Sequence, residues 1–88
     1  INTSRGAIIN EHDLYKALSQ RWINSAALDV FEKEPIASGN PLLALENIVL
    51  SCHIGWYTEE SQTELKRKAA ENVRDVLMGK IPRYLIKM

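Results

Sequence analysis

Three residues with complementary chemistry stand at separate points of this 88-residue sequence: Arg5, Glu34 and His53. An arginine guanidinium is planar and can bind a carboxylate through two hydrogen bonds. A glutamate beside a histidine favours the imidazolium form, which can deliver a proton in general acid–base catalysis. Brought together, the three side chains would suit a substrate that carries a carboxylate and whose hydroxyl or carbonyl group exchanges a proton.

Each residue also has a simpler interpretation, and none of the three is specific alone. Arg5 could be a surface arginine, and Glu34 could belong to a solvated charge run with Glu32 and Lys33. His53 could be a histidine whose ring is hydrogen-bonded by backbone at the end of a strand. The sequence therefore supports a site only if the fold brings these residues to the same place.

Other candidate chemistry is weaker. Cys52 and His53 together suggest a Cys–His nucleophile, but adjacent strand residues point to opposite faces of a sheet. We therefore expect Cys52 to be a small apolar filler. No metal site is expected, because His53 has no second histidine or cysteine at ligand spacing.

The elements that must position these residues follow an alternating pattern. Asn10 can cap a helix over about 11–20, and Thr58 or Ser61 can cap a longer helix over about 58–78. Residues 25–30 and 47–51 are short and apolar, which is typical of strands buried on both faces. Helix, strand, loop, strand, helix predicts an α/β fold with a parallel sheet. Sites in such sheets gather at the carboxyl ends of the strands, where Glu34 and His53 would lie.

Composition excludes several classes of function. Eleven basic and eleven acidic residues balance, so neither nucleic acid nor an acidic membrane surface is an expected partner. A single cysteine excludes an internal disulfide framework, and no apolar run approaches the ~20 residues of a membrane span. We expect a cytoplasmic protein. The chain opens on Ile1 without an initiator methionine, from which we expect a piece of a longer protein.

Three stretches of the sequence carry a family resemblance. "INTSRG", "ALDVFEKEP" and "PLLALENIVLSCHIG", followed by the long helix, resemble the C-terminal part of the D-isomer-specific 2-hydroxyacid dehydrogenases in the same order. The resemblance runs from residue 1 to about 86. It implies that residues 1–57 are the second half of a doubly wound, Rossmann-like NAD-binding domain. Residues 58–88 would then be a C-terminal helix and tail that reach toward a substrate domain.

The resemblance also implies roles for individual residues. Arg5 would bind the substrate carboxylate and carbonyl, Glu34 would be the catalytic glutamate, and His53 would be the acid/base histidine. Asp29 would hold the nicotinamide carboxamide. Further residues lining the cofactor cleft would be Thr3, Ser4 and Gly55. Glu32 and Lys33 have no role in the family pattern and are expected to be loop charges.

The implied activity is hydride transfer between NAD(H), with NADP as the alternative, and a D-2-hydroxy acid or 2-oxo acid in a homodimeric enzyme. The second hypothesis is a dinucleotide-sensing interaction protein of the corepressor kind, which shares the fold. Trp56 and Tyr57 replace the small residues common after the histidine; Trp56 could wall the substrate pocket, or the two rings could serve only in packing. The glycine-rich phosphate loop G-x-G-x-x-G is absent from these 88 residues, so the isolated chain is expected to be inactive.

Overall fold

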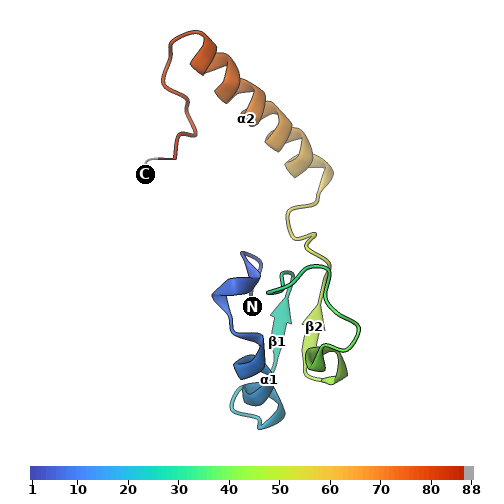
Figure 1. Ribbon diagram of the computed structural model, residues 1–88. Helices are drawn as coiled ribbons and strands as arrows, with labels where there is room; N and C mark the ends of the chain where they lie inside the picture. Colours follow the sequence, from blue (N-terminus) through green and yellow to red (C-terminus); the bar gives the residue numbers. More distant parts are fainter. Residues whose placement is uncertain (87–88) are drawn as a thin grey trace. The chain divides into compact units, whose positions relative to one another are not determined.

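A computed structural model describes residues 1–86, and the chain divides after Gly55 into two units, Ile1–Gly55 and Trp56–Met88 (Figure 1). The first unit contains two strands, one α-helix and two short 3₁₀-helices, and the second contains one long α-helix. Their bounds are η1 (Gly6–Ile8), α1 (Glu11–Ser19), β1 (Ala26–Leu28), η2 (Pro41–Ala44), β2 (Ile48–Leu50) and α2 (Glu59–Leu77). Both predicted helices and both predicted strands are confirmed. The last two residues of the predicted tail lie outside the described residues.

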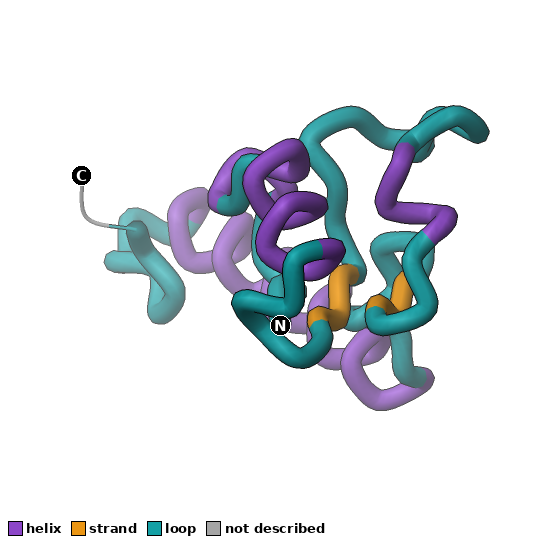
Figure 2. Tube along the Cα trace, turned by 90° about the horizontal axis from the view of Figure 1, so that it is seen from below, coloured by secondary structure: helices purple, strands orange, loops and turns teal. Residues whose placement is uncertain are grey.

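The two strands of the first unit pair in parallel and lie side by side (Figures 1 and 2). Their register joins Ala26 to Ile48 and Leu28 to Leu50. A single parallel bridge joins Asn2 to Leu28 on the other side of β1. The parallel pairing and the helices confirm the predicted α/β class, and they bring the carboxyl ends of the strands to one edge.

The core of the first unit lies on one face of this small sheet. Leu14 and Leu18 of α1 form a cluster with Leu28, Phe31 and Leu42, and Leu18 and Leu42 are fully buried. Alternate strand residues join the cluster at its margin, namely Ala26, Ile48 and Leu50.

The prediction that both strands are buried on both faces is wrong for β2. Val49, which lies between the two core-facing residues of β2, is 70% exposed. Side chains alternate between the faces of a strand, so Val49 is directed away from the face that α1 covers. No described element packs against the face of the sheet that carries Val49. The sequence of an apolar strand does not reveal whether another element packs on that face.

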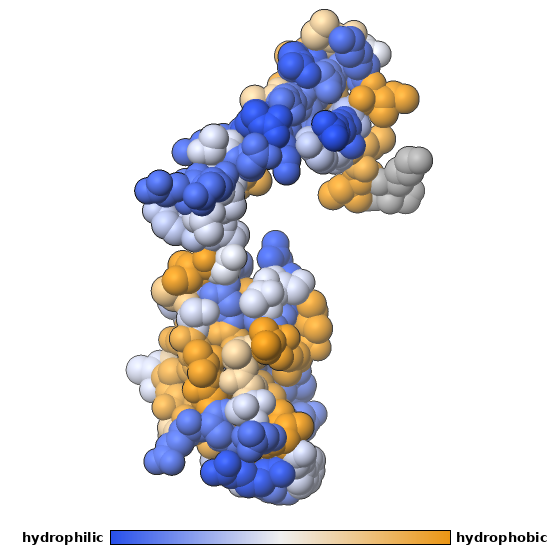
Figure 3. Space-filling model, turned by 180° about the vertical axis from the view of Figure 1, so that it is seen from behind, coloured by the Kyte–Doolittle hydropathy of each residue, from blue (hydrophilic) through white to orange (hydrophobic). Residues whose placement is uncertain are grey.

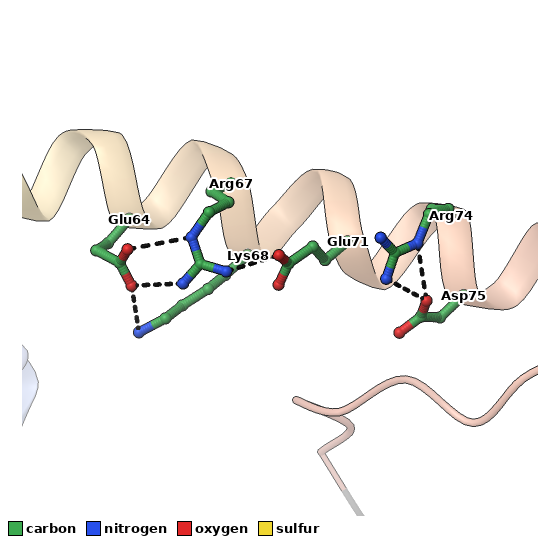
Figure 4. A network of polar contacts seen from close by, with 6 residues as sticks. All are labelled: Glu64, Arg67, Lys68, Glu71, Arg74 and Asp75. Carbon is green, nitrogen blue, oxygen red and sulfur yellow. Dashed lines mark hydrogen bonds and ion pairs between the residues drawn. The ribbon is translucent and has the colours of Figure 1, made fainter.

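In the second unit, α2 is stabilised mainly by contacts within the helix. The Thr58 side chain accepts the N–H of Ser61, the Ser61 side chain accepts the N–H of Thr58, and Gly79, at φ +68°, follows the helix. Ion pairs run along one side, joining Glu64 to Arg67 and Lys68, Arg67 to Glu71, and Arg74 to Asp75 (Figure 4). The Arg67 and Lys68 side chains lower the pKa of Glu64 to about 2.

No residue of α2 is buried, and its apolar residues Leu65, Val73, Val76 and Leu77 are exposed. Hydrophilic residues cover most of the face of α2 that is visible in Figure 3, with hydrophobic residues beside them. These residues form an apolar stripe along α2 that the described residues leave uncovered. Its packing toward a substrate domain stays a prediction.

Gly6 is required by the close approach of two backbone segments in the first unit. A Cβ added at this residue would lie 1.9 Å from both the carbonyl carbon and the oxygen of Phe31. We expect Gly6→Ala to destabilise the protein by about 3 kcal/mol or more, because backbone cannot give way as a flexible side chain can. Gly39→Ala is the matched control, since an added Cβ there meets nothing within 4 Å. Equal unfolding midpoints in denaturant for the two variants would contradict this packing.

Candidate active site

Three segments of the first unit meet at the carboxyl edge of the strands: residues 2–6, 29–34 and 51–55. The backbone N–H of Asp29 donates to the Asn2 carbonyl at 2.9 Å, and the N–H of His53 donates to the Asp29 carbonyl at 2.8 Å. The segment after β1 is therefore the central one of the three. This arrangement places the candidate residues of all three segments near one another.

Glu34 and His53 are in direct contact in the structure. Glu34 Oε2 lies 2.6 Å from His53 Nδ1, although the two residues are 19 positions apart in the sequence. The other carboxylate oxygen, Oε1, accepts the backbone N–H of Phe31 at 3.0 Å. Both oxygens of Glu34 are thus held, and the carboxylate fixes the orientation of the imidazole through Nδ1.

These two contacts also determine the charge of Glu34. The hydrogen bond with His53, followed by the Phe31 N–H, lowers the pKa of the Glu34 carboxyl, with a smaller electrostatic contribution from Arg5. Glu34 is therefore ionised at neutral pH.

Arg5 lines the same hollow as this pair. A depression of about 300 Å³ is bounded by Arg5, Glu34 and His53 together with Gly6, Ala7, Phe31 and Glu32. The Arg5 Nη1 donates to the Ser4 carbonyl at 2.7 Å, and the Arg5 carbonyl accepts from the Asn2 side chain at 2.9 Å. The three residues that the sequence suggested for chemistry are thus brought to one place.

His53 has an unusual backbone conformation. Its φ is +57°, in the left-handed region that residues other than glycine seldom adopt, although histidine and asparagine do so more readily than most. The hydrogen bond from its N–H to the Asp29 carbonyl holds the chain in this turn. Non-glycine residues in such conformations persist where surrounding contacts fix them, and they concentrate at functional sites.

Asp29 fixes the turn that carries His53. Its Oδ1 accepts the Ser51 hydroxyl at 2.5 Å and the Ile54 N–H at 2.9 Å, and its Oδ2 accepts the Gly55 N–H at 2.8 Å. The side chain is almost fully buried. The Ser51 hydroxyl and then the Gly55 N–H hold the pKa of this carboxyl below its usual range, against the opposing effect of burial. Asp29 is therefore a buried, ionised anchor for residues 51–55.

The residues predicted to contact the cofactor are adjacent in part. A Cβ added at Gly55 would lie 3.0 Å from Asp29 Oδ2 and 3.9 Å from the Thr3 Cβ, so Thr3, Asp29 and Gly55 form one group. Ser4 is exposed, and its N–H donates to the Asn2 side chain at 3.1 Å. Their contacts with a cofactor stay a prediction.

Trp56 belongs to the second unit. It is 51% exposed, and its ring makes an edge contact with Tyr57 at 5.5 Å between centroids. Its carbonyl accepts the hydroxyl of Ser61 at the start of α2. The predicted role of Trp56 as a wall of the substrate pocket also stays a prediction.

The expectation that Cys52 is a buried filler is wrong, because its thiol is free and exposed. β2 ends at Leu50, so Cys52 lies in the following loop and the alternation of a strand does not apply to it. It lines a second hollow of about 390 Å³, which shares Phe31, Glu34 and His53 with the first and is otherwise largely apolar.

Two positioning residues were not singled out from the sequence. Asn2 is buried and binds both the Arg5 carbonyl and the Ser4 N–H, which shapes the turn before Arg5. Ser51 donates to Asp29. An asparagine that opens a run of turn residues was an available signal for Asn2. For Ser51 no local signal existed, because its partner is 22 positions away.

Within residues 1–86, no three histidine, cysteine or acidic side chains are grouped so that they could hold a metal ion. Across the same range, no helix has both the length and the apolar character needed to cross a bilayer.

The first unit matches a known protein family. The family model described as "D-isomer specific 2-hydroxyacid dehydrogenase, NAD binding domain" matches residues 1–55, which is more than half of the chain. The chain belongs to the D-isomer specific 2-hydroxyacid dehydrogenase family. The resemblance inferred from the motifs is thereby confirmed, and so is the Rossmann-like class of the NAD-binding domain.

Individual members of this family align over almost all of the chain. A glyoxylate reductase of Korarchaeum cryptofilum is 44% identical over 86 residues, which cover 98% of this chain and 26% of that protein. A D-3-phosphoglycerate dehydrogenase of Methanocaldococcus jannaschii is 42% identical over 88 residues, which cover all of this chain and 17% of that protein.

A solved structure gives the same result. The probable 2-hydroxyacid dehydrogenase of Rhizobium etli, in complex with NADP, HEPES and L(+)-tartaric acid, superposes with a TM-score of 0.80 at 31% identity. The match covers 98% of this chain and 26% of that one. The chain thus spans about a quarter or less of the length of these relatives.

Ser51→Ala tests the anchoring of Asp29. A carboxyl whose pKa is lowered on folding stabilises the native state above its unfolded pKa of about 4, and this contribution is lost as the pH falls through the native pKa. Losing the Ser51 hydroxyl raises the Asp29 pKa, so we expect Tm at neutral pH to fall by about 4–8 °C. The deficit relative to the wild-type protein should shrink as the pH falls through the native pKa of Asp29, below which Asp29 is protonated in both proteins.

The measurement is thermal unfolding from about pH 7 to about pH 3. Ser38→Ala, at an exposed serine in the loop before η2, is the control and should leave Tm unchanged. A Ser51→Ala deficit of the same size at every pH would mean that Ser51 does not act through the charge of Asp29.

Proposed function

We propose that residues 1–88 form the C-terminal part of an NAD(P)-dependent D-2-hydroxyacid dehydrogenase, with Arg5, Glu34 and His53 as its catalytic residues. One observation carries this proposal: the Glu34–His53 contact of 2.6 Å borders the same hollow as Arg5. In this arrangement His53 can donate a proton, the Glu34 carboxylate lies beside it, and Arg5 offers a positive charge to an acidic substrate. Membership of the family and the relatives named as reductases or dehydrogenases support it.

Arg5 binds the substrate. Its guanidinium has five N–H donors in a fixed plane, which match the two oxygens of a carboxylate. The turn at residues 2–5 is held by the Asn2 side chain, so the backbone that carries the guanidinium is fixed before substrate arrives. A 2-oxo acid bound in this way presents its carbonyl oxygen to His53.

His53 moves the proton. In reduction, a hydride adds to the carbonyl carbon, and the imidazolium transfers the proton on Nε2 to the oxygen that becomes the hydroxyl. Neutral imidazole remains, with its other proton on Nδ1 toward Glu34. In oxidation the neutral imidazole accepts the hydroxyl proton, and the Glu34 carboxylate stabilises the imidazolium that results.

The cofactor supplies or accepts the hydride, and the residues near Asp29 have the chemistry to hold its nicotinamide. Asp29 Oδ2 accepts a single N–H from the protein, whereas Oδ1 accepts two donors, so Oδ2 retains acceptor capacity for an amide group. Gly55 leaves room beside this oxygen that a Cβ would fill. The Rhizobium etli relative was solved with NADP, so both NAD and NADP are to be assayed.

The substrate is proposed to be a small 2-oxo acid. Glyoxylate is the first to test, because the Korarchaeum cryptofilum relative is named a glyoxylate reductase. Residues 1–88 alone should show no turnover, because the sequence lacks a glycine-rich phosphate loop. The homodimer implied by the resemblance is likewise proposed for the complete enzyme.

Glu34→Gln in the full-length enzyme tests the acid/base pair. Reduction requires the imidazolium, so its rate falls as the pH rises. Glutamine keeps the size and a hydrogen-bonding oxygen but removes the charge that stabilises the imidazolium. We expect the alkaline limb of kcat/KM for glyoxylate reduction to move to lower pH. A limb that does not move would contradict the pairing, because a distant loop charge would be screened by salt.

Substitutions of Arg5 and His53 should change the steady-state kinetics in different ways. Arg5→Gln is expected to raise KM and to lower kcat, because Arg5 contacts the substrate in both the ground state and the transition state. His53→Asn is expected to lower kcat by about 10²–10⁴-fold, because asparagine tolerates the left-handed backbone but cannot donate the proton. Steady-state kinetics of reduction measures both effects.

Cys52→Ala is the control for these variants. Cys52 is adjacent to His53 but has no role in the proposed reaction, so its replacement should leave kcat unchanged. A large loss of kcat in Cys52→Ala, with His53→Asn retaining activity, would support a thiol nucleophile instead.

A further inference from the structure

Two glutamates of the first unit accept each other's backbone N–H groups. Glu32 Oε1 accepts the N–H of Glu11 at 2.9 Å, and Glu11 Oε1 accepts the N–H of Glu32 at 2.7 Å. The residues are 21 positions apart, so the pair joins the loop after β1 to the first residue of α1. Glu32 was expected to be a loop charge, and it is an exposed loop residue, but its side chain and N–H are both bonded to Glu11.

The pair has a third member. The second oxygen of Glu11, Oε2, accepts the Asn40 side-chain N–H at 2.8 Å, and Asn40 Oδ1 accepts the N–H of Leu42 at the start of η2. Glu11 thus ties together the start of α1, the start of η2 and the loop that contains Glu32. Leu42 is fully buried in the core, so these bonds join the loop to the core of the first unit.

The loop held in this way is the one that carries Glu34. Residues 29–36 lie in neither a helix nor a strand, so side-chain bonds and packing must fix their course. Phe31 is buried against the core, and its N–H binds Glu34 Oε1. Glu32 is the next residue along the chain. Asp29 holds the loop before Phe31, and the bonds of Glu32 to Glu11 hold it after Phe31. With the loop on this course, Glu34 Oε2 lies 2.6 Å from His53 Nδ1.

The neighbouring charge behaves differently. Lys33 lies between Glu32 and Glu34, is exposed, and makes no hydrogen bond or ion pair within the described residues. Loop 32–34 therefore contains one residue of the acid/base pair, one residue bonded to α1 and one solvated residue. The sequence shows only three adjacent charged residues, Glu32, Lys33 and Glu34, whereas the structure gives each of them different contacts.

We infer that the reciprocal Glu11–Glu32 pair positions Glu34 for catalysis, so that Glu32 acts on the reaction through the Glu34–His53 contact. This inference rests on the function proposed above. What the pair requires of Glu32 is an acceptor oxygen for the Glu11 N–H rather than a negative charge. Misplacing a catalytic group by about 1 Å can cost on the order of 10²-fold in rate, so a loosened loop has a measurable effect.

The experiment compares four variants of the full-length enzyme that contains residues 1–88: Glu32→Ala, Glu32→Gln, Lys33→Ala and Glu34→Gln. Glu32→Ala removes the acceptor, and we expect it to lower kcat by about tenfold and to move the alkaline limb of glyoxylate reduction in the same direction as Glu34→Gln. KM for the cofactor should stay unchanged. Glu32→Gln keeps the acceptor and should restore the wild-type profile, and Lys33→Ala should match the wild-type enzyme.

The outcomes separate the two proposals. If Glu34→Gln moves the alkaline limb of the pH profile for glyoxylate reduction and Glu32→Ala does not, this inference is wrong and the proposed function stands. If Glu34→Gln leaves the limb in place, the proposed function itself fails. Should Glu32→Ala not fold, Glu11→Ala carries the same expectation, because it removes the acceptor for the Glu32 N–H. Loss of folding in both variants would overturn the inference, since the pair would then support the whole unit rather than Glu34.

Discussion

Asp29 makes the contacts on which the geometry of the site depends. Its N–H and carbonyl bind the segments that lead to Arg5 and to His53, and its carboxylate accepts three donors from residues 51–55. A buried carboxylate without partners would be costly, whereas one with several donors is stable and remains charged. Because one residue binds both neighbouring segments, the relative positions of Arg5 and His53 are determined at a single point of the chain. The strand that precedes Asp29 supplies the rigid base for this point.

The two units are stabilised by different physical means. The first unit buries leucines and a phenylalanine between α1, the strands and η2. In the second unit, α2 has no buried residue, and its order comes from the cap at Thr58, the glycine that follows the helix and the ion pairs along one side. Exposed ion pairs of this kind are individually weak and are screened by salt. Added salt should therefore act on α2 more than on the core of the first unit.

Features determined within a few residues were predictable from the sequence. Asn10 caps α1 as its position suggested, and α2 begins after Thr58 and is followed by Gly79. The approximate position of the site was also predictable, because parallel strands bring their carboxyl ends to one edge.

Features set by distant partners were not predictable. The bonds of Glu32 to Glu11 and of Ser51 to Asp29 join residues more than twenty positions apart, and no local pattern marks them. Burial of Val49 depends on what covers the second face of the sheet, which the strand itself does not encode. The left-handed turn at His53 follows from the backbone bond to Asp29. A resemblance of motifs could suggest the residue but not its conformation.

The parallel register of β1 and β2 has a consequence for the order in which the protein assembles. Paired residues of the two strands are 22 positions apart, as in Ala26 with Ile48, so the intervening chain must close a loop before any strand contact forms. Contacts in α2 span four residues or fewer along its ion pairs, and such helices form in about a microsecond. The Glu34–His53 contact requires the strand register, the Asp29 bonds and the loop between them to be in place. We therefore expect the Glu34–His53 contact to form late in folding, after α2 and the leucine core, so that partly folded chains lack this contact.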